Sequence, residues 1–393
     1  MATGRQLGVK RSPTMPKKEH EEGNLLEDGE PKTWKPVFEQ PKVSLFLKGS
    51  VLLALLCQNT TYTLVRRYSM AVLHEKYDAS ECLLMGEVFK LFFAIAMTLA
   101  DSAPSDAGPG GAGRWELHAM GAKLWYLARS SGKMLTLAAI YGVMNVLSYV
   151  SIRRVDAAVF TVCAQLKILT TAAFSVVLLR RRVSATKWRA LLQLVLGCVL
   201  VTVPQISSVV HAHDVVAAGA ANGTLDFAET AAASAKSLTF AIGVGAVVLE
   251  VTMSGFASIY FEKVVKTAEE NLTVWDRNCQ LAMHSIALYV AYAAFERHYF
   301  YDPNAEPYRP LHDFSSVAWF LALLGGGGGL LVAMTVKVAD SVLKTLATSI
   351  SIVTSTLASH YILGGPLDLP MAIGALVVAL AVLNYTLDSS PVD

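Results

Sequence analysis

The chain is poor in charged residues and in cysteine for its length. Of its 393 residues, 16% are charged and 53% are hydrophobic, whereas about a quarter of the residues of a soluble protein are charged. The five cysteines have no CxxC spacing, so neither a disulfide framework nor a zinc site is expected. A net charge of +2 without a basic stripe argues against nucleic-acid partners. Together these absences favour an all-α polytopic membrane protein that uses no metal and no cofactor.

Two further signals are missing. Residues 1–43 are polar and contain no apolar run of the kind that a cleaved signal peptide needs, so they are predicted to be a disordered cytosolic tail. Five consecutive glycines, Gly325 to Gly329, are not followed by Lys and Ser or Thr, which excludes a nucleotide phosphate loop. These glycines are expected to let helices pack closely, and a backbone wall beside a substrate is the alternative.

What the sequence does contain is a series of apolar runs, each close to the roughly 20 residues that cross a membrane. They divide into a first set within residues 44–206 and a second set within residues 237–388, separated by a loop at 207–236 and followed by a tail at 389–393. The predicted spans are 44–66, 79–100, 132–152, 156–179, 187–206, 237–262, 273–296, 314–336, 341–362 and 368–387.

The loops between these spans differ in charge. Basic residues gather after the second and fourth spans, including Arg180, Arg181 and Arg182, whereas residues 207–235 contain no Lys or Arg. The positive-inside rule therefore predicts that both termini are cytosolic and that the 207–236 loop is lumenal. That loop carries the sequon Asn222-Gly223-Thr224, which is either a glycosylation site or a chance match.

The two sets of spans share a local pattern. A basic residue is followed three residues later by Asp in Arg153–Asp156, between the third and fourth spans, and again in Lys337–Asp340, between the eighth and ninth. Each Asp can cap the helix that follows it. Five spans in each set give the two copies opposite orientations, so the sequence predicts two inverted five-helix repeats, as in many secondary transporters.

The two sets each carry a lysine in a corresponding place, Lys167 in the fourth predicted span and Lys344 in the ninth. A charge at the centre of a membrane helix costs about 2.5–3.5 kcal/mol, so such residues usually face a cavity or a partner. Two ammonium groups at one cavity would repel each other, and a phosphorylated ligand would relieve that repulsion. The hypothesis from these residues is a carrier of phosphorylated anions, and structural ion pairing is the alternative.

Other polar residues share helix faces within the spans. Glu87 and Lys90, three residues apart, are expected to pair with each other, with ligand gating as the alternative. Tyr141 and Asn145, four apart, form one face that could read a base or a sugar. Further polar candidates are Gln165, Gly255, Ser258, Tyr260, Asn278, Gln280 and Thr345.

Several segments together resemble the nucleotide-sugar transporters of the drug/metabolite transporter superfamily, in the branch of the UDP-galactose and CMP-sialic acid carriers. The most specific are 165–171 (QLKILTT), 254–257 (SGFA) and 260–263 (YFEK). Shorter matches are Gln58-Asn59, Arg67-Tyr68, Glu87 with Lys90, 155–158, Arg277-Asn278 with Gln280, and 337–344.

The resemblance implies ten membrane helices and exchange of a cytosolic nucleotide sugar for lumenal nucleoside monophosphate across the Golgi membrane, or alternatively that of the endoplasmic reticulum. It also implies phosphate contacts from two lysines and nucleotide contacts from five other residues. A cavity or gating role would belong to a third group. The implied phosphate contacts are Lys167 and Lys344. The implied nucleotide contacts are Tyr141, Asn145, Gly255, Ser258 and Asn278. The implied cavity or gating residues are Glu87, Lys90, Gln165, Tyr260, Gln280 and Thr345.

The chain also departs from that family's pattern. Val146 stands where a second Asn is common, Phe160 replaces a common Tyr, and Ala282 and His284 replace bulkier or hydroxyl side chains. Residues 337–355 look closer to the UDP-galactose members, so a UDP-sugar exchanged for UMP is predicted, with a CMP-sialic acid/CMP exchanger as the alternative. From other classes, a polytopic membrane transferase and a non-transporting receptor stay open.

Overall fold

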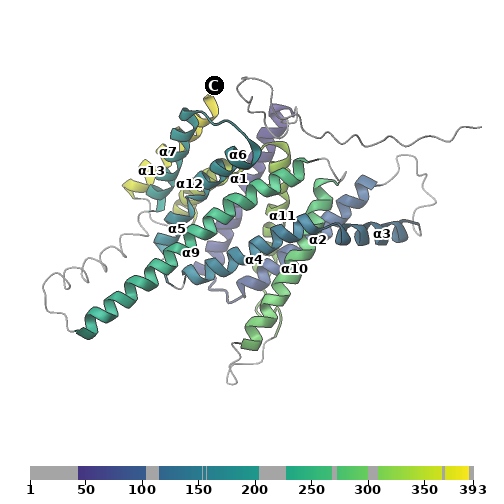
Figure 1. Cartoon of the computed structure of the whole chain (residues 1–393), viewed down its shortest axis with the longest axis horizontal. Coiled ribbons are helices and arrows are strands. Elements are labelled where there is room, and N and C mark those ends of the chain that lie inside the picture. Colours follow the sequence, from purple (N-terminus) through teal and green to yellow (C-terminus); the bar gives the residue numbers. More distant parts are fainter. Residues whose placement is uncertain are drawn as a thin grey trace, which may run out of the picture. The chain divides into compact units, whose positions relative to one another are not determined.

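The computed structural model describes residues 43–102, 115–152, 154–155, 157–202, 227–267, 272–299, 309–364 and 368–388. These residues form helices and connecting turns, with no strand among them (Figure 1). The prediction of an all-helical membrane protein with several spans is confirmed. Within the described residues, six stretches are both long and apolar enough to cross a membrane: Ala79–Asp101, Val162–Leu179, Leu238–Lys266, Ser316–Val338, Ser341–Ile362 and Leu369–Leu387. The predictions for the N-terminal tail before residue 43, for the sequon at Asn222 and for the tail at 389–393 fall outside the described residues.

The helices follow the predicted spans with one addition, one interruption and one extension. The extension is the helix expected at 237–262, which covers Phe227–Lys266, so residues 227–236 are helical rather than part of the predicted 207–236 loop. The helices within residues 44–206 are α1 (Leu45–Ala71), α2 (Ala79–Ser102), α3 (Trp115–Arg129), α4 (Gly132–Ile152), α5 (Ala157–Ala164), α6 (Lys167–Leu179) and α7 (Ala185–Thr202). Those that follow are α9 (Phe227–Lys266), α10 (Val274–Tyr299), α11 (Ser316–Val338), α12 (Ser341–Leu363) and α13 (Leu369–Leu387).

Local sequence explains where several of these helices begin and end. The Ser315 side chain accepts hydrogen bonds from the backbone N–H groups of Val317 and Ala318 at the start of α11. The capping role predicted for Asp340 is confirmed, since its Oδ1 accepts a 2.7 Å hydrogen bond from the backbone N–H of Leu343. The matching residue, Asp156, lies outside the described residues. Gly364 ends α12 with φ of +67°, the left-handed conformation that glycine adopts readily.

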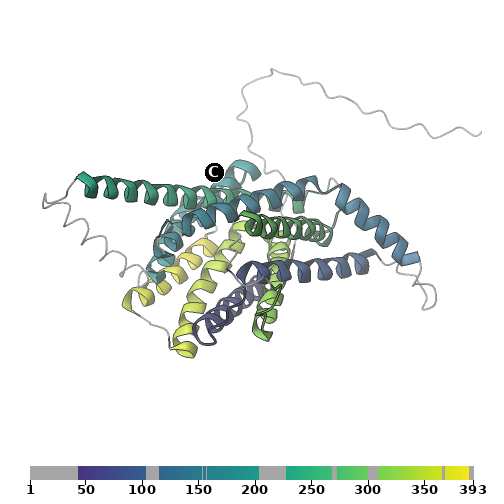
Figure 2. The same ribbon diagram turned by 90° about the horizontal axis from the view of Figure 1, so that it is seen from below.

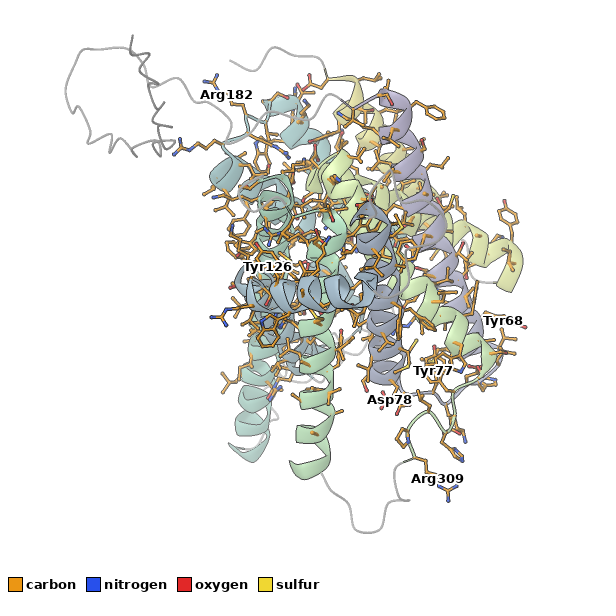
Figure 3. All side chains as sticks on the ribbon, turned by 90° about the vertical axis from the view of Figure 1, so that its right-hand side faces the viewer. Tyr68, Tyr77, Asp78, Tyr126, Arg182 and Arg309 are labelled. Carbon is orange, nitrogen blue, oxygen red and sulfur yellow. The ribbon has the colours of Figure 1, made fainter. Side chains whose placement is uncertain are left out.

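The additional helix is α3, in a segment that was predicted to be only a basic loop. Its Leu127 is fully buried, and the backbone carbonyl of that residue accepts a 3.0 Å hydrogen bond from Gln280 Nε2 of α10. Asp276 of α10 forms an ion pair with Lys123 (3.3 Å). Figure 3 shows α3, which carries the labelled Tyr126, running across the neighbouring helices. The connection between α2 and α4 is therefore partly helical and fastened to α10.

The most extensive helix contacts join the two predicted sets of spans rather than helices of one set. The pairs are α7 with α13, α2 with α10 and α11, α9 with α4 and α6, and α1 with α11 and α12 (Figures 1 and 2). One buried apolar cluster likewise combines Leu137 of α4, Ala257 of α9 and Val336 of α11. Each set thus completes the core of the other, and polar residues distant in sequence meet between them.

Candidate functional site

The segment around Lys167 is broken, which corrects the prediction of a continuous helix over 156–179. Helix α5 ends at Ala164 and α6 begins at Lys167. In the turn between them, the Leu166 N–H bonds to the Cys163 carbonyl (3.0 Å) and the Ile168 N–H to the Gln165 carbonyl (3.1 Å), a tighter pattern than that of an α-helix. Lys167 is therefore the first residue of α6, at the helix end that the helix dipole makes electropositive. A lysine at this end favours an anion.

The second lysine approaches the same place from α12. Lys344 Nζ donates a 3.0 Å hydrogen bond to Ser258 Oγ of α9. Lys344 and Lys167 are close enough to repel each other electrostatically. The structure thus brings together three of the predicted site residues, Lys167, Lys344 and Ser258, from three helices.

Close packing of α6 on α9 makes this approach possible. A Cβ atom added at Gly255 would lie 2.5 Å from Thr170 Oγ1, closer than real side chains come. The Thr170 hydroxyl also donates a 3.1 Å hydrogen bond to the Val251 carbonyl. Gly255 therefore acts first as a contact between helices, and it holds α9 against the helix that begins with Lys167.

Glu87, Lys90, Tyr141 and Asn145 form a second polar group, on α2 and α4. The predicted pairing of Glu87 with Lys90 is confirmed, because Lys90 Nζ lies 2.7 Å from Glu87 Oε1. The Glu87 carboxylate interacts electrostatically with the hydroxyl of Tyr141. Asn145 forms a side-chain hydrogen bond with Tyr289 of α10. The Tyr289 hydroxyl also interacts electrostatically with the Glu87 carboxylate. This group therefore brings α2, α4 and α10 together around one carboxylate.

Tyr289 was missed by the sequence analysis. The only available signal was a hydroxyl-bearing aromatic residue in an otherwise apolar stretch of the seventh predicted span. Nothing in that stretch indicates that Tyr289 meets Asn145, because the two residues are far apart in the chain.

The remaining predicted site residues have other immediate partners. Asn278 is buried and its side chain bonds to the Val274 carbonyl of its own helix (2.8 Å). Gln280 faces α3, as described above, and Thr345 bonds to the Val342 carbonyl (2.7 Å). Tyr260 stacks on Phe256 with ring centroids 6.0 Å apart, and Gln165 is buried in the turn between α5 and α6.

A third group of charges, which we call the Glu262 cluster, also joins the two sets of helices. Glu262 at the end of α9 has no exposed surface. Its carboxylate pairs with Arg181, which follows α6, and with Lys266 (2.7 Å), and it accepts the Ser341 backbone N–H (2.9 Å). Lys266 also bonds to the Ala339 carbonyl (2.6 Å). The cluster therefore fastens the turn after α6 to the turn between α11 and α12.

Comparison with known proteins gives consistent matches along the chain. The family model described as nucleotide-sugar transporter matches residues 43–386. The UDP-galactose/UDP-N-acetylglucosamine transporter srf-3 of Caenorhabditis elegans is 32% identical over 348 residues, covering 88% of this chain and 84% of that protein. The human UDP-galactose translocator is 33% identical, covering 87% and 77%. The UDP-galactose transporter of Schizosaccharomyces pombe is 30% identical, covering 86% and 88%.

A solved crystal structure also matches in three dimensions. Its TM-score is 0.56 at 12% identity, and the alignment covers 86% of this chain and 97% of the other. At that identity the match supports the fold alone.

Proposed function

Since this chain belongs to the nucleotide-sugar transporter family and is a transporter rather than an enzyme, we propose that it exchanges a cytosolic UDP-sugar for lumenal UMP. The observation that carries the proposal is the meeting of Lys167 and Lys344, which brings two like charges from both sets of helices to one place. Two ammonium groups in a membrane protein favour a ligand with two negative charges. The diphosphate of a UDP-sugar and the phosphate of UMP each supply about that charge near neutral pH.

The uracil base is proposed on the basis of the relatives. The names of the worm, human and yeast proteins specify UDP-galactose, and the worm protein's name adds UDP-N-acetylglucosamine. UDP-galactose and UDP-N-acetylglucosamine are therefore the first candidate substrates. CMP-sialic acid exchanged for CMP is the second candidate, because segments such as 165–171 resemble the branch that contains both kinds of carrier.

The two polar groups are proposed to bind different parts of the ligand. Lys167 and Lys344, with Ser258, are proposed to hold the phosphates, and the Gly255 contact keeps this part of the site narrow. Tyr141 and Asn145, with Tyr289 behind them, are proposed to hold the nucleoside or the sugar beside the Glu87–Lys90 pair. Asn278 is proposed to contact the nucleotide only after its side chain leaves the Val274 carbonyl. Gln165, Tyr260, Gln280 and Thr345 are proposed to shape or gate the cavity.

The proposed architecture is ten membrane helices in two inverted repeats, with α5 and α6 together making one broken span and both termini in the cytosol of Golgi membranes. Transport then proceeds by alternating access around the lysines. A ligand drives such a change only if it interacts differently with the two states. Exchange is favoured because an occupied site neutralises the two lysine charges more fully than an empty site does.

The substrate assignment is tested by uptake into proteoliposomes that hold the purified protein and lumenal UMP. Labelled UDP-galactose, UDP-N-acetylglucosamine and CMP-sialic acid are compared at equal concentration. Uptake of one or both UDP-sugars well above that of CMP-sialic acid is expected. The same assay is run with vesicles that contain CMP instead of UMP. Uptake of CMP-sialic acid alone, into the CMP-loaded vesicles, would replace the uracil assignment by cytosine. No uptake of any of the three nucleotide sugars would overturn the proposed function.

A further inference from the structure

Glu250 is a carboxylate in the membrane that the sequence analysis did not single out. It lies on α9, between two points at which this helix is held to its neighbours. The Ser151 hydroxyl of α4 donates a 3.1 Å hydrogen bond to the Gly243 carbonyl, and Thr170 of α6 bonds to the Val251 carbonyl at the same distance. Glu250 therefore lies where α9 faces both α4 and α6.

The Glu250 carboxylate is only half satisfied by hydrogen bonds. Its side chain is hydrogen-bonded to Ser148 of α4, while its Oε2 atom is buried and has no hydrogen-bond partner within the described part of the chain. A buried carboxylate oxygen without a hydrogen-bond partner is costly, and a nearby positive charge offsets that cost.

That positive charge is Lys167. The Glu250 carboxylate and the Lys167 ammonium attract each other electrostatically. The other carboxylates in the membrane helices described above have their own cations, since Glu87 pairs with Lys90 and Glu262 with Arg181 and Lys266. Glu250 is thus the acidic residue that interacts with Lys167, the lysine at the break between α5 and α6.

We propose that Glu250 is an internal counter-ion of Lys167. It neutralises the lysine when the transport site is empty, and the phosphate of an incoming ligand displaces it. The inference rests on the proposed phosphate role of Lys167. A ligand phosphate that binds Lys167 must compete with the Glu250 carboxylate, and the attraction between Glu250 and Lys167 is lost when the phosphate takes its place. Glu250 therefore weakens the binding of phosphorylated ligands.

Glu250 has a second consequence for the transport cycle. When the empty site closes, the electrostatic free-energy cost of burying Lys167 is smaller if the lysine already has a counter-ion. The carrier can then return empty at a low rate, so exchange is favoured without being obligatory. Replacing the carboxylate by a neutral amide removes this compensation and makes transport depend more strongly on the internal nucleotide.

The test is binding of labelled UMP and labelled uridine to the full-length protein in detergent. We expect Glu250→Gln to tighten UMP binding by about three- to tenfold, equivalent to roughly 0.6–1.4 kcal/mol, and to leave uridine binding unchanged, since uridine carries no phosphate. Asp368→Asn is the matched control, because it removes the same charge from an exposed residue whose side chain makes no cap hydrogen bond. Unchanged or weaker UMP binding by Glu250→Gln would overturn the inference.

A double variant tests the partnership with Lys167. In the Lys167→Ala background, Glu250→Gln is expected to give no tightening of UMP binding. An equal gain in both backgrounds would show that Glu250 acts independently of Lys167 and would overturn the inference. If the unaltered protein binds neither UMP nor UDP-galactose, the proposed function itself fails, and the inference fails with it. If it binds UMP normally and Glu250→Gln has no effect, only the inference fails.

Discussion

At the scale of single residues, the proposed site consists of buried charges whose partners come from other helices. Lys344 illustrates this, since its ammonium bonds to Ser258 and lies within electrostatic range of Lys167. A hydrogen bond from a charged group contributes about 1.5–3 kcal/mol. We therefore expect Lys344→Ala to weaken UMP binding by about tenfold or more while uridine binding is retained, measured with labelled ligands in detergent. An equal loss for both ligands would show that the change disturbs the whole site rather than a phosphate contact.

Glu262 gives a prediction about stability at the same scale. Glu262→Gln leaves Arg181 and Lys266 without their shared carboxylate, and breaking a buried ion pair on one side costs about 3–5 kcal/mol. A clearly lower midpoint of thermal unfolding in detergent is expected. Lys263→Gln is the control, because Lys263 is the next residue and its side chain is exposed. Equal midpoints for both variants would contradict a structural role of the Glu262 cluster.

At the scale of elements, helices α2 and α11 pack through glycine. A Cβ atom at Gly326 would lie 2.5 Å from the Gly86 carbonyl oxygen, a backbone atom that cannot give way cheaply. A Cβ atom at Gly327 would meet nothing within 4 Å. Gly326→Ala is expected to destabilise the protein by about 1–3 kcal/mol through overpacking, whereas Gly327→Ala should be close to neutral. Thermal unfolding of the two variants makes the comparison, and similar midpoints would refute the packing role.

The elements also show how far the sequence could predict this fold. The spans follow from apolar length, and the packing role expected for the glycine run agrees with the close approach of Gly326 to Gly86. The break before Lys167 could not be predicted, because residues 157–179 contain no Pro or Gly and read as one apolar helix. In the candidate site, the lysines were predictable as costly charges in apolar runs. Glu250 and Tyr289 were not, since their importance comes from neighbours that only the folded chain supplies.

At the scale of the whole molecule, two of the polar connections between the two sets of helices involve residues at helix ends. One is the Glu262 cluster. At the other, the Ser315 hydroxyl before α11 donates a 2.6 Å hydrogen bond to the Glu75 carboxylate after α1. Figure 3 labels Arg182 near the first place and Tyr77, Asp78 and Arg309 near the second. If transport proceeds by the proposed alternating access, these two connections open in turn, and conformational change is expected in the contacts between the sets.

The proposed orientation gives a further prediction at this scale. With the 180–182 arginines in the cytosol, epitope tags at the N-terminus and the C-terminus should both react with antibodies after the plasma membrane alone is permeabilised. A tag inserted within residues 207–226, before α9, should react only after internal membranes are opened. Reaction of the loop tag under the first condition would reverse the orientation.

The central claim is that two lysines from the two sets of helices form one phosphate site that serves both sides of the membrane in turn. Its most direct test is uptake of labelled UDP-galactose into proteoliposomes with UMP inside, compared with empty vesicles, for the unaltered protein and for Lys167→Ala and Lys344→Ala. The account predicts that internal UMP stimulates uptake severalfold in the unaltered protein and that each lysine variant loses this stimulation while remaining folded. Stimulation that survives in both variants would contradict it.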